Sequence, residues 1–233
     1  RIPVNDFSFY DNMLDTAVLF GAVPKRYRDL HLSELDTYFA MARGYQGTQG
    51  DVKAFAMKKW FNTNYHYMVP EIADDTQIFL TGTKPFSEWQ QGISGKPVLI
   101  GPFTFLRLAK YTGEKTAEDF ADEAAAAYCT YLEKWNELGA EWVEFDEPCL
   151  VMDLTAAEID LFRRLYQKIL AAKGSVRVLL QTYFGDVRDC YSTVCKLAFD
   201  GIGLDFLEGK QSLSLVQANG FPKEKVLFAG VVN

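Results

Sequence analysis

The stretch Glu141-Trp142-Val143-Glu144-Phe145-Asp146 decides the fold class, because it predicts a short buried strand with helical patterns on both sides. Before it, apolar residues recur at helical spacing over residues 116–138. After it, Thr155-Ala156-Ala157-Glu158 forms a capping box, which predicts the start of a second helix. Residues 176–181 predict the next strand. Strands joined by helices over short loops indicate a parallel sheet covered by helices.

The same alternation extends toward both ends of the chain. Further strands are predicted over residues 77–81, 97–101, 202–206 and 226–232, and further helices over residues 6–20, 31–43, 52–61, 186–197 and 211–218. Residues 85–91 are predicted to form a turn or a helix. A doubly wound sheet is the competing fold, but it needs a Gly-rich phosphate loop. The nearest match, Gly201-x-Gly203-x-x-Phe206, lacks the third glycine. We therefore predict an α/β fold, a (β/α)₈ TIM barrel that is incomplete at both ends.

The chain length fits a single truncated domain. A complete barrel needs about 250 residues, whereas this chain has 233 and shows five or six strand–helix cycles. We expect one domain over residues 1–233, without an internal boundary. The chain starts without an initiator methionine and stops directly after a predicted strand, so we expect it to be a piece of a longer protein.

Composition argues against several classes of partner, although it leaves room for a local basic pocket that binds a small anion. The formal net charge is −7, whereas a nucleic-acid binder needs a basic face. No apolar run reaches the roughly 18 residues that cross a membrane. The cysteines have no metal-binding spacing, and with two histidines they cannot easily form a zinc site: Cys129, Cys149, Cys190 and Cys195. We expect free thiols and a cytoplasmic protein.

Acidic residues follow two of the predicted strands, at the edge where barrels carry their functional groups. Asp146 and Glu147 end one strand, and Asp205 and Glu208 lie at the end of another. Carboxylates at strand ends often cap the next loop, and that structural interpretation stays open. The functional alternative is a glycoside hydrolase in which Glu147 and Glu208 serve as acid/base and nucleophile.

A second candidate site lies around residues 58–67. Lys58 and Lys59 precede Trp60 and Phe61, and a polar and aromatic run follows: Asn64, Tyr65, His66 and Tyr67. Cationic donors beside flat apolar rings suit an anionic ligand that has an aromatic ring system. The simpler alternative is an exposed helix face for the lysines, a structural histidine and tyrosines packed in the core.

The run Lys59-Trp60-Phe61-Asn62-Thr63-Asn64-Tyr65-His66-Tyr67-Met68-Val69-Pro70-Glu71 resembles a signature of the cobalamin-independent methionine synthases. Further segments match that family in the same order. They are Asp6-Phe7-Ser8-Phe9-Tyr10-Asp11, Ala42-Arg43-Gly44, residues 96–102, residues 142–148, Thr182-Tyr183-Phe184 and Ala229-Gly230-Val231-Val232-Asn233. The resemblance covers nearly the whole chain, and its thirteen-residue run is highly specific.

The resemblance implies a two-barrel enzyme of which this chain is most of the N-terminal barrel. Such an enzyme transfers a methyl group from 5-methyltetrahydropteroyltri-L-glutamate to homocysteine and forms methionine without cobalamin. The family's zinc binds the homocysteine thiolate in the C-terminal barrel, which is outside this chain. The expected partners are thus the folate, homocysteine and the C-terminal barrel, and we expect no methyl transfer by this chain alone.

The resemblance also assigns site residues. Lys59 takes the position of the family's folate-contacting lysine, directly before Trp-Phe, and Asn64 is a weaker candidate for the same polyglutamate tail. His66 and Tyr67 are expected to shape that surface. The resemblance gives no role to Asp146, Glu147 or Asp205, and no catalytic or metal-binding residue is expected in this chain. The link from Trp89 to Lys96 is shorter than in the family.

Overall fold

The computed structural model describes residues 2–4, 7–91 and 95–232. Arg1, residues 5–6, residues 92–94 inside the Trp89–Lys96 link, and Asn233 lie outside the described residues. The main sheet has six strands, and every neighbouring pair in it is parallel. In spatial order these strands are β1 (Pro3–Val4), β7 (Lys96–Ile100), β9 (Trp142–Asp146), β10 (Arg177–Gln181), β11 (Gly201–Asp205) and β12 (Val226–Gly230).

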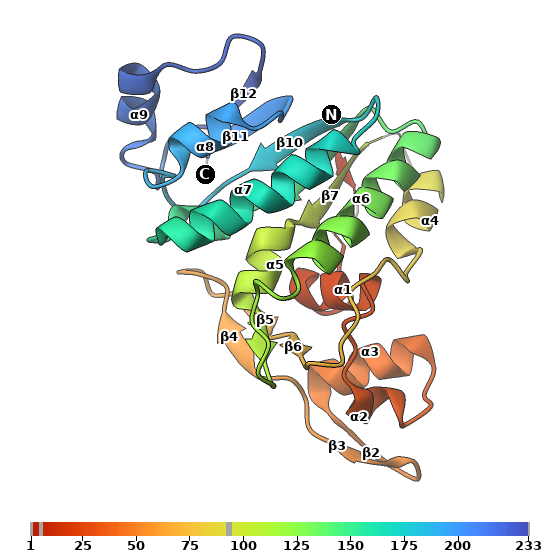
Figure 1. Ribbon diagram of the computed structural model, residues 1–233. Coiled ribbons are helices and arrows are strands. Elements are labelled where there is room, and N and C mark those ends of the chain that lie inside the picture. The colour runs from red at the N-terminus through yellow and green to blue at the C-terminus, as the bar shows by residue number, and fades with distance from the viewer. Residues whose placement is uncertain (1, 5–6, 92–94, 233) are drawn as a thin grey trace.

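Helices connect these strands in chain order, as the alternation predicts. The helices are α1 (Asn12–Leu19), α4 (Lys84–Gln91), α5 (Pro102–Leu108), α6 (Ala121–Glu137), α7 (Ala156–Ala171), α8 (Tyr191–Lys196) and α9 (Ser212–Asn219), with a 3-10 turn η1 (Pro148–Val151). Figure 1 shows α6 and α7 lying side by side along one face of the sheet. The predicted α/β fold with a parallel sheet is confirmed, because spatial order follows chain order from β7 to β12.

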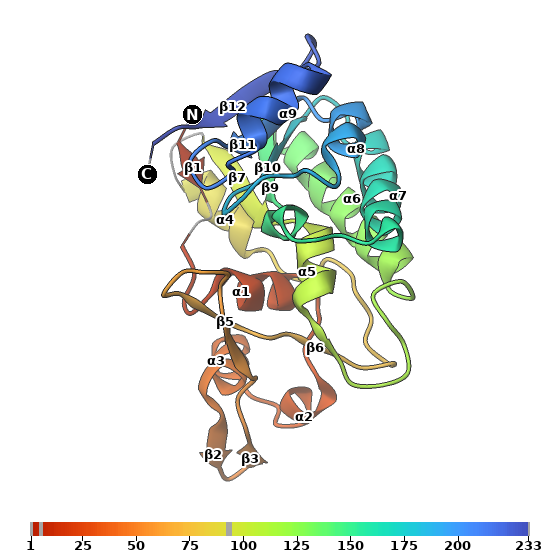
Figure 2. The same ribbon diagram turned by 90° about the vertical axis from the view of Figure 1, so that its left-hand side faces the viewer.

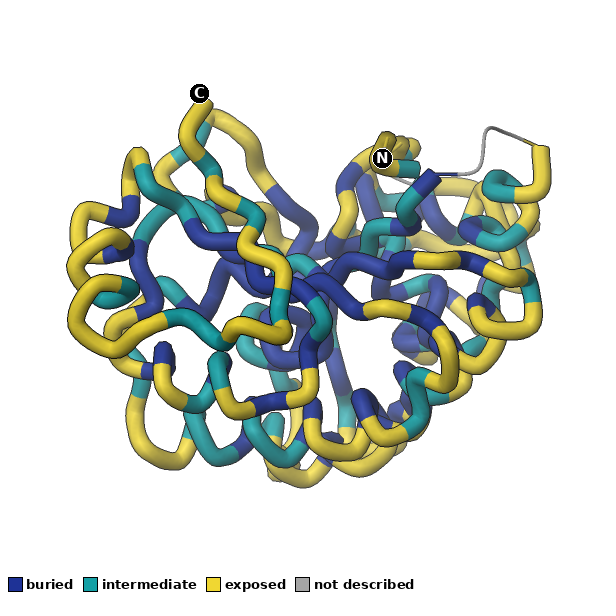
Figure 3. The backbone as a smooth tube through the Cα atoms, turned by 90° about the horizontal axis from the view of Figure 1, so that it is seen from above, coloured by how far each residue is buried: buried dark blue, intermediate teal, exposed yellow. Residues whose placement is uncertain are grey.

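The main core lies between β9 and the helices that cover it. Phe145 is fully buried, and its ring centroid lies 5.5 Å from that of Tyr128 and 6.2 Å from those of Tyr131 and Tyr166. Neighbouring strand residues face opposite sides, so Glu144 and Asp146 lie on the other face of the sheet. Figure 3 shows buried backbone in the middle of the molecule and exposed backbone around its rim.

A long excursion separates β1 from β7 and carries a smaller core of its own. It contains α1, α4, α2 (Lys25–Arg28), α3 (Glu34–Arg43) and the short strands β2 (Tyr45–Gly47), β3 (Gly50–Val52), β4 (Met57–Lys59), β5 (His66–Met68) and β6 (Glu71–Ile72). Strand β6 pairs with β8 (Lys110–Tyr111). Tyr27, Met41 and Phe55 are buried in the smaller core. Figures 1 and 2 both place α2, α3, β2 and β3 at one end of the molecule.

Two predicted elements are wrong, and both lie in this excursion. Residues 52–61 do not form a helix, because residues 57–59 pair as a strand with residues 66–68. Residues 77–81 do not form a strand, because this segment binds the end of α1 instead: Phe79 N donates to Phe20 O at 3.2 Å and Thr81 N to Leu19 O at 2.9 Å. The single domain over residues 1–233 stays a prediction.

Candidate functional site

The hairpin of β4 and β5 carries the two residues predicted to bind the folate tail. Lys59 pairs in register with His66, and Asn64 lies in the turn between the strands. Lys59 and Asn64 are exposed, as is Lys58. Neither lysine has a hydrogen bond, ion pair or ring contact within the described part of the chain. Residues 55–70 contain no Asp or Glu, so the hairpin is locally positive although the chain is acidic.

Aromatic side chains support this hairpin and connect it to the main sheet. Trp60 is only 8% exposed, and its ring contacts Phe61 at 5.1 Å and Tyr67 at 5.6 Å between centroids. The ring of Phe61 lies 5.5 Å from that of Phe184. Because Phe184 follows β10, this contact places the tip of the hairpin at the carboxyl end of the sheet.

Asp11 fixes the base of the same hairpin, a role the sequence does not reveal. Its carboxylate caps α1 by accepting from Met13 N at 2.8 Å and Leu14 N at 3.0 Å. The other oxygen accepts from Met68 N at 3.0 Å, 57 residues away. Burial raises the pKa of the Asp11 carboxyl to about 6, although the backbone donors oppose that shift. The local sequence Asp11-Asn12-Met13 is typical of a helix cap. No local pattern, however, predicts the hydrogen bond from Met68 N in β5 to Asp11.

A polar group lies on the face of β7 and β9 that is opposite the helices, and Tyr183, which follows β10, joins it. Lys96 forms an ion pair with Glu144, and Tyr183 donates a hydrogen bond to Asp146 Oδ2 at 3.2 Å. Burial raises the pKa of Asp146 to about 7 and lowers the pKa of Lys96. The Tyr183 ring lies 4.7 Å from that of Phe184, so this group is connected to the contact at the tip of the hairpin.

Glu147 is structural, and the glycoside hydrolase prediction is not supported. Its carboxylate is fully buried and accepts from Phe103 N at 3.0 Å, Thr104 N at 2.7 Å and the Tyr166 hydroxyl at 2.7 Å. Both oxygens are thus occupied and none faces solvent. Glu208 is exposed, so the two carboxyl groups do not line a common site.

Asp205 is likewise a capping residue. One carboxylate oxygen accepts from Leu207 N and Glu208 N, and the other accepts from Phe184 N at 2.9 Å. This arrangement orders the turns that follow β10 and β11. The structural interpretation of the acids at the strand ends is therefore the one observed for Glu147 and Asp205.

Comparison with known protein families shows to which family this chain belongs. The family described as "Cobalamin-independent synthase, N-terminal domain" matches residues 1–233. The chain belongs to the cobalamin-independent methionine synthases. Two relatives named 5-methyltetrahydropteroyltriglutamate--homocysteine methyltransferase are 58% identical over 237 residues (Streptococcus suis) and 53% identical over 236 residues (Campylobacter jejuni subsp. doylei). Each alignment covers 100% of this chain but only 32% and 31% of the relative, so the chain spans about a third of their length.

A solved structure supports the barrel fold. A B12-independent methionine synthase from Shewanella sp. W3-18-1, in complex with selenomethionine, aligns with a TM-score of 0.53. It is 15% identical, and the alignment covers 71% of this chain and 53% of that chain. At this identity the likeness bears on the fold alone. Together with the open parallel sheet, it confirms the predicted incomplete (β/α)₈ barrel.

The described residues of this cobalamin-independent synthase domain do not form a site for a metal ion. No group of three or more His, Cys, Asp or Glu side chains lies close enough to hold one there. The four cysteines are free, and burial raises the pKa of Cys149 and Cys190 to about 12, which keeps these thiols protonated. No helix in the described part is long and apolar enough to cross a membrane.

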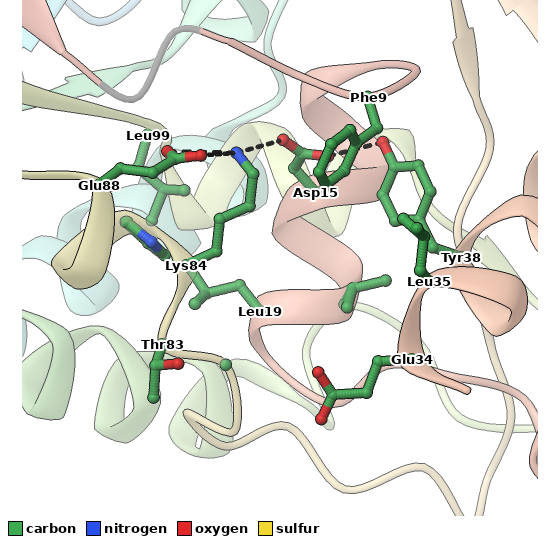
Figure 4. Close-up of a pocket in the computed structure, with 13 residues that line it drawn as sticks. Phe9, Asp15, Leu19, Glu34, Leu35, Tyr38, Thr83, Lys84, Glu88 and Leu99 are labelled. Atoms are coloured by element: carbon green, nitrogen blue, oxygen red, sulfur yellow. Dashed lines mark hydrogen bonds and ion pairs between the residues drawn. The ribbon is translucent and has the colours of Figure 1, made fainter. Parts of the chain in front are cut away.

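One well-defined pocket of the synthase domain lies away from the predicted site. It has a volume of about 420 Å³ between α1, α3 and α4. Figure 4 shows the Lys84 ammonium between Asp15 and Glu88, at 3.6 and 3.0 Å, and the Tyr38 hydroxyl bound to Asp15. Lys59 and Asn64 do not line this pocket. Lys84, Asp15, Glu88 and Tyr38 satisfy one another there, and Glu34 adds a further negative charge, so the pocket does not suit the anionic tail of a folate.

Proposed function

We propose that this chain is the folate-side domain of a longer methyltransferase. In that enzyme, a methyl group passes from 5-methyltetrahydropteroyltriglutamate to homocysteine, which yields methionine. The relatives' names, the family match and the specific run around Lys59 support the proposal. The observation that carries it is Lys59 itself: an unpaired, exposed ammonium on an acid-free hairpin at the carboxyl end of the sheet.

Lys59 would bind the glutamate tail of the folate. A triglutamate tail carries several carboxylates, and an ammonium binds carboxylates through charge-assisted hydrogen bonds. No acidic residue of this chain competes for Lys59 within the described residues, so its full charge is available. Asn64, in the turn of the same hairpin, can add a neutral amide donor. Trp60 and Tyr67 keep the backbone beneath these side chains in place.

The chemistry of methyl transfer would lie outside this chain. Zinc, which the family resemblance implies for activating the homocysteine thiol, finds no set of ligands within the described residues. We therefore place zinc and homocysteine in the other barrel of the longer protein and expect this chain alone to be inactive. Free cysteines support a cytoplasmic location for the whole enzyme.

The test uses the full-length protein and a Lys59→Ala substitution. Losing one charge-assisted contact to the tail should raise the KM for the triglutamate folate about tenfold, which corresponds to about 1.4 kcal/mol. The kcat and the KM for homocysteine should not change, because the contact is the same in ground and transition states. Steady-state kinetics with each substrate varied in turn measures both.

The matched control is Lys58→Ala, which removes the same charge from the same strand. If Lys59 makes a direct contact, the control should change the KM for the folate by no more than about twofold, the amount expected of a screened, exposed charge. Equal effects of both substitutions would indicate only a general attraction to the hairpin. An unchanged KM in Lys59→Ala would remove the assignment.

A further inference from the structure

Two phenylalanines with an unusual backbone conformation meet at the tip of the Lys59 hairpin. Phe61 has φ +52° and Phe184 has φ +72°, and their ring centroids lie 5.5 Å apart. Left-handed backbone is uncommon for a bulky side chain and persists only where surrounding contacts enforce it. Both residues adopt this unfavourable conformation at the same contact. This indicates that the contact between the two rings helps to hold the hairpin against the sheet.

The sheet holds Phe184 firmly on its side of the contact. Asp205, at the end of β11, accepts a hydrogen bond from Phe184 N at 2.9 Å. The neighbouring Tyr183 donates its hydroxyl to Asp146 at the end of β9, and its ring packs edge-on against Phe184 at 4.7 Å. Phe184 is therefore tied to three strands and forms a fixed point of the barrel.

The hairpin, by contrast, depends on outside support. Strands β4 and β5 pair over only three residues each, and a two-stranded ribbon of this kind is marginal alone. Asp11 fixes its base through Met68 N. Trp60 and Tyr67 anchor its middle in the main core, and its tip meets the sheet through Phe61, which lies two residues after Lys59 and packs edge-on against Trp60.

We infer that Phe184 is a positioning residue for the folate tail. Its ring holds Phe61, and this contact, added to the anchoring by Trp60 and Tyr67, sets where the tip of the hairpin carries the Lys59 ammonium. This inference rests on the proposed function of Lys59. It adds a series of contacts that connects the ends of β9 and β11, through Phe184 and Phe61, to the hairpin that carries Lys59.

The experiment compares Phe184→Ala with Phe184→Tyr in the full-length protein. Phe184→Ala should raise the KM for the triglutamate folate about fivefold and leave kcat and the KM for homocysteine unchanged. Phe184→Tyr retains the ring and should restore the original KM. In a Lys59→Ala background, Phe184→Ala should have little additional effect, because both changes remove the same interaction. Phe221→Ala is the matched control, since that ring is also partly buried but lies away from the hairpin.

Hydrogen exchange separates this inference from the function on which it rests. Amides of residues 57–68 should exchange faster in Phe184→Ala, while those of α6 and α7 keep their protection. Unchanged exchange in the hairpin, or a KM shift in Lys59→Ala without one in Phe184→Ala, overturns the positioning role alone. If Lys59→Ala itself leaves the KM for the folate unchanged, the proposed function of the site is wrong, and the positioning role is overturned with it.

Discussion

At the scale of single residues, the Glu147 carboxylate connects three parts of the fold. It follows β9, caps the first turn of α5 through Phe103 N and Thr104 N, and accepts the Tyr166 hydroxyl from α7. A Cβ at Gly101 would lie 2.2 Å from Glu147 Oε1, so only glycine lets the carboxylate approach the helix. The site is complete within the fold and leaves no room for a substrate.

Glu147→Ala should destabilise the protein strongly. The substitution leaves two buried N–H groups and one hydroxyl without their acceptor, and we expect a loss of about 3 kcal/mol in the free energy of unfolding. Urea denaturation followed by circular dichroism measures the loss. Glu208→Ala is the control, because that exposed side chain should cost less than about 0.5 kcal/mol. Equal losses for the two glutamates would contradict the assigned role of Glu147.

The sequence predicts where such residues lie better than what they do. Strand periodicity correctly placed Asp146 and Glu147 at the end of a strand. It could not show which donors they meet, because the partners of Glu147 in α5 lie 43 and 44 residues away. For the same reason, nothing in the letters Tyr183-Phe184-Gly185 predicts a left-handed backbone at a phenylalanine or its contact with Phe61.

At the scale of elements, local signals succeeded where a helix or strand is stabilised by its own neighbours. The stripe of α6 and the capping box of α7 were both predicted, since their partners are three or four residues apart. Residues 52–61 were predicted as a helix, but residues 57–59 form strand β4 instead. Their partners are residues 66–68 and, through Met68, the distant Asp11. Tertiary contacts outweigh the weak helical pattern there.

Thr155→Ala tests the capping box of α7. Thr155 Oγ1 accepts from Glu158 N, and the Glu158 carboxylate accepts from Thr155 N at 2.8 Å. Loss of the hydroxyl should lower the free energy of unfolding by about 1 kcal/mol. Thr155→Ser keeps the acceptor and should stay within a few tenths of a kcal/mol of the parent. Thermal unfolding of both variants provides the measurement, and a serine variant as weak as the alanine one would argue against capping as the cause.

At the scale of the whole molecule, the strand–helix alternation was enough to predict a parallel barrel-like sheet, because each cycle repeats the same short pattern. The net charge of the chain says less about its ligand than the distribution of charge along the sequence does. The net −7 argues against nucleic acid as a general partner, yet residues 55–70 have no acidic side chain and carry the lysine of the proposed site. The excursion that presents this segment is folded by contacts distant in sequence, and it is where the predictions of elements were wrong.

Three carboxyl groups, two buried (Asp11 and Glu147) and one half-buried (Asp146), couple the stability of the whole molecule to pH. Burial raises the pKa of Asp11 from 3.8 to about 6, that of Asp146 from 3.8 to about 7, and that of Glu147 from 4.5 to about 7. The folded chain therefore binds these protons more tightly than the unfolded chain. Their contribution to stability is fully present below about pH 4 and is lost as pH rises through about 6 to 7. Carboxyls with lowered pKa values act in the opposite sense, but at lower pH: Asp74, Asp119, Glu158 and Asp160.

The protein should accordingly be more stable at pH 5 than at pH 8. We expect the free energy of unfolding to fall by on the order of 2 kcal/mol between these values, since one unit of pKa shift corresponds to about 1.4 kcal/mol and partial relaxation reduces the sum. Urea midpoints at half-unit intervals of pH measure the slope. Glu147→Gln removes one titrating group, so its slope should be shallower even though its absolute stability is lower. A midpoint that rises from pH 5 to pH 8, or an unchanged slope in Glu147→Gln, would show that these carboxyls are not held protonated by burial.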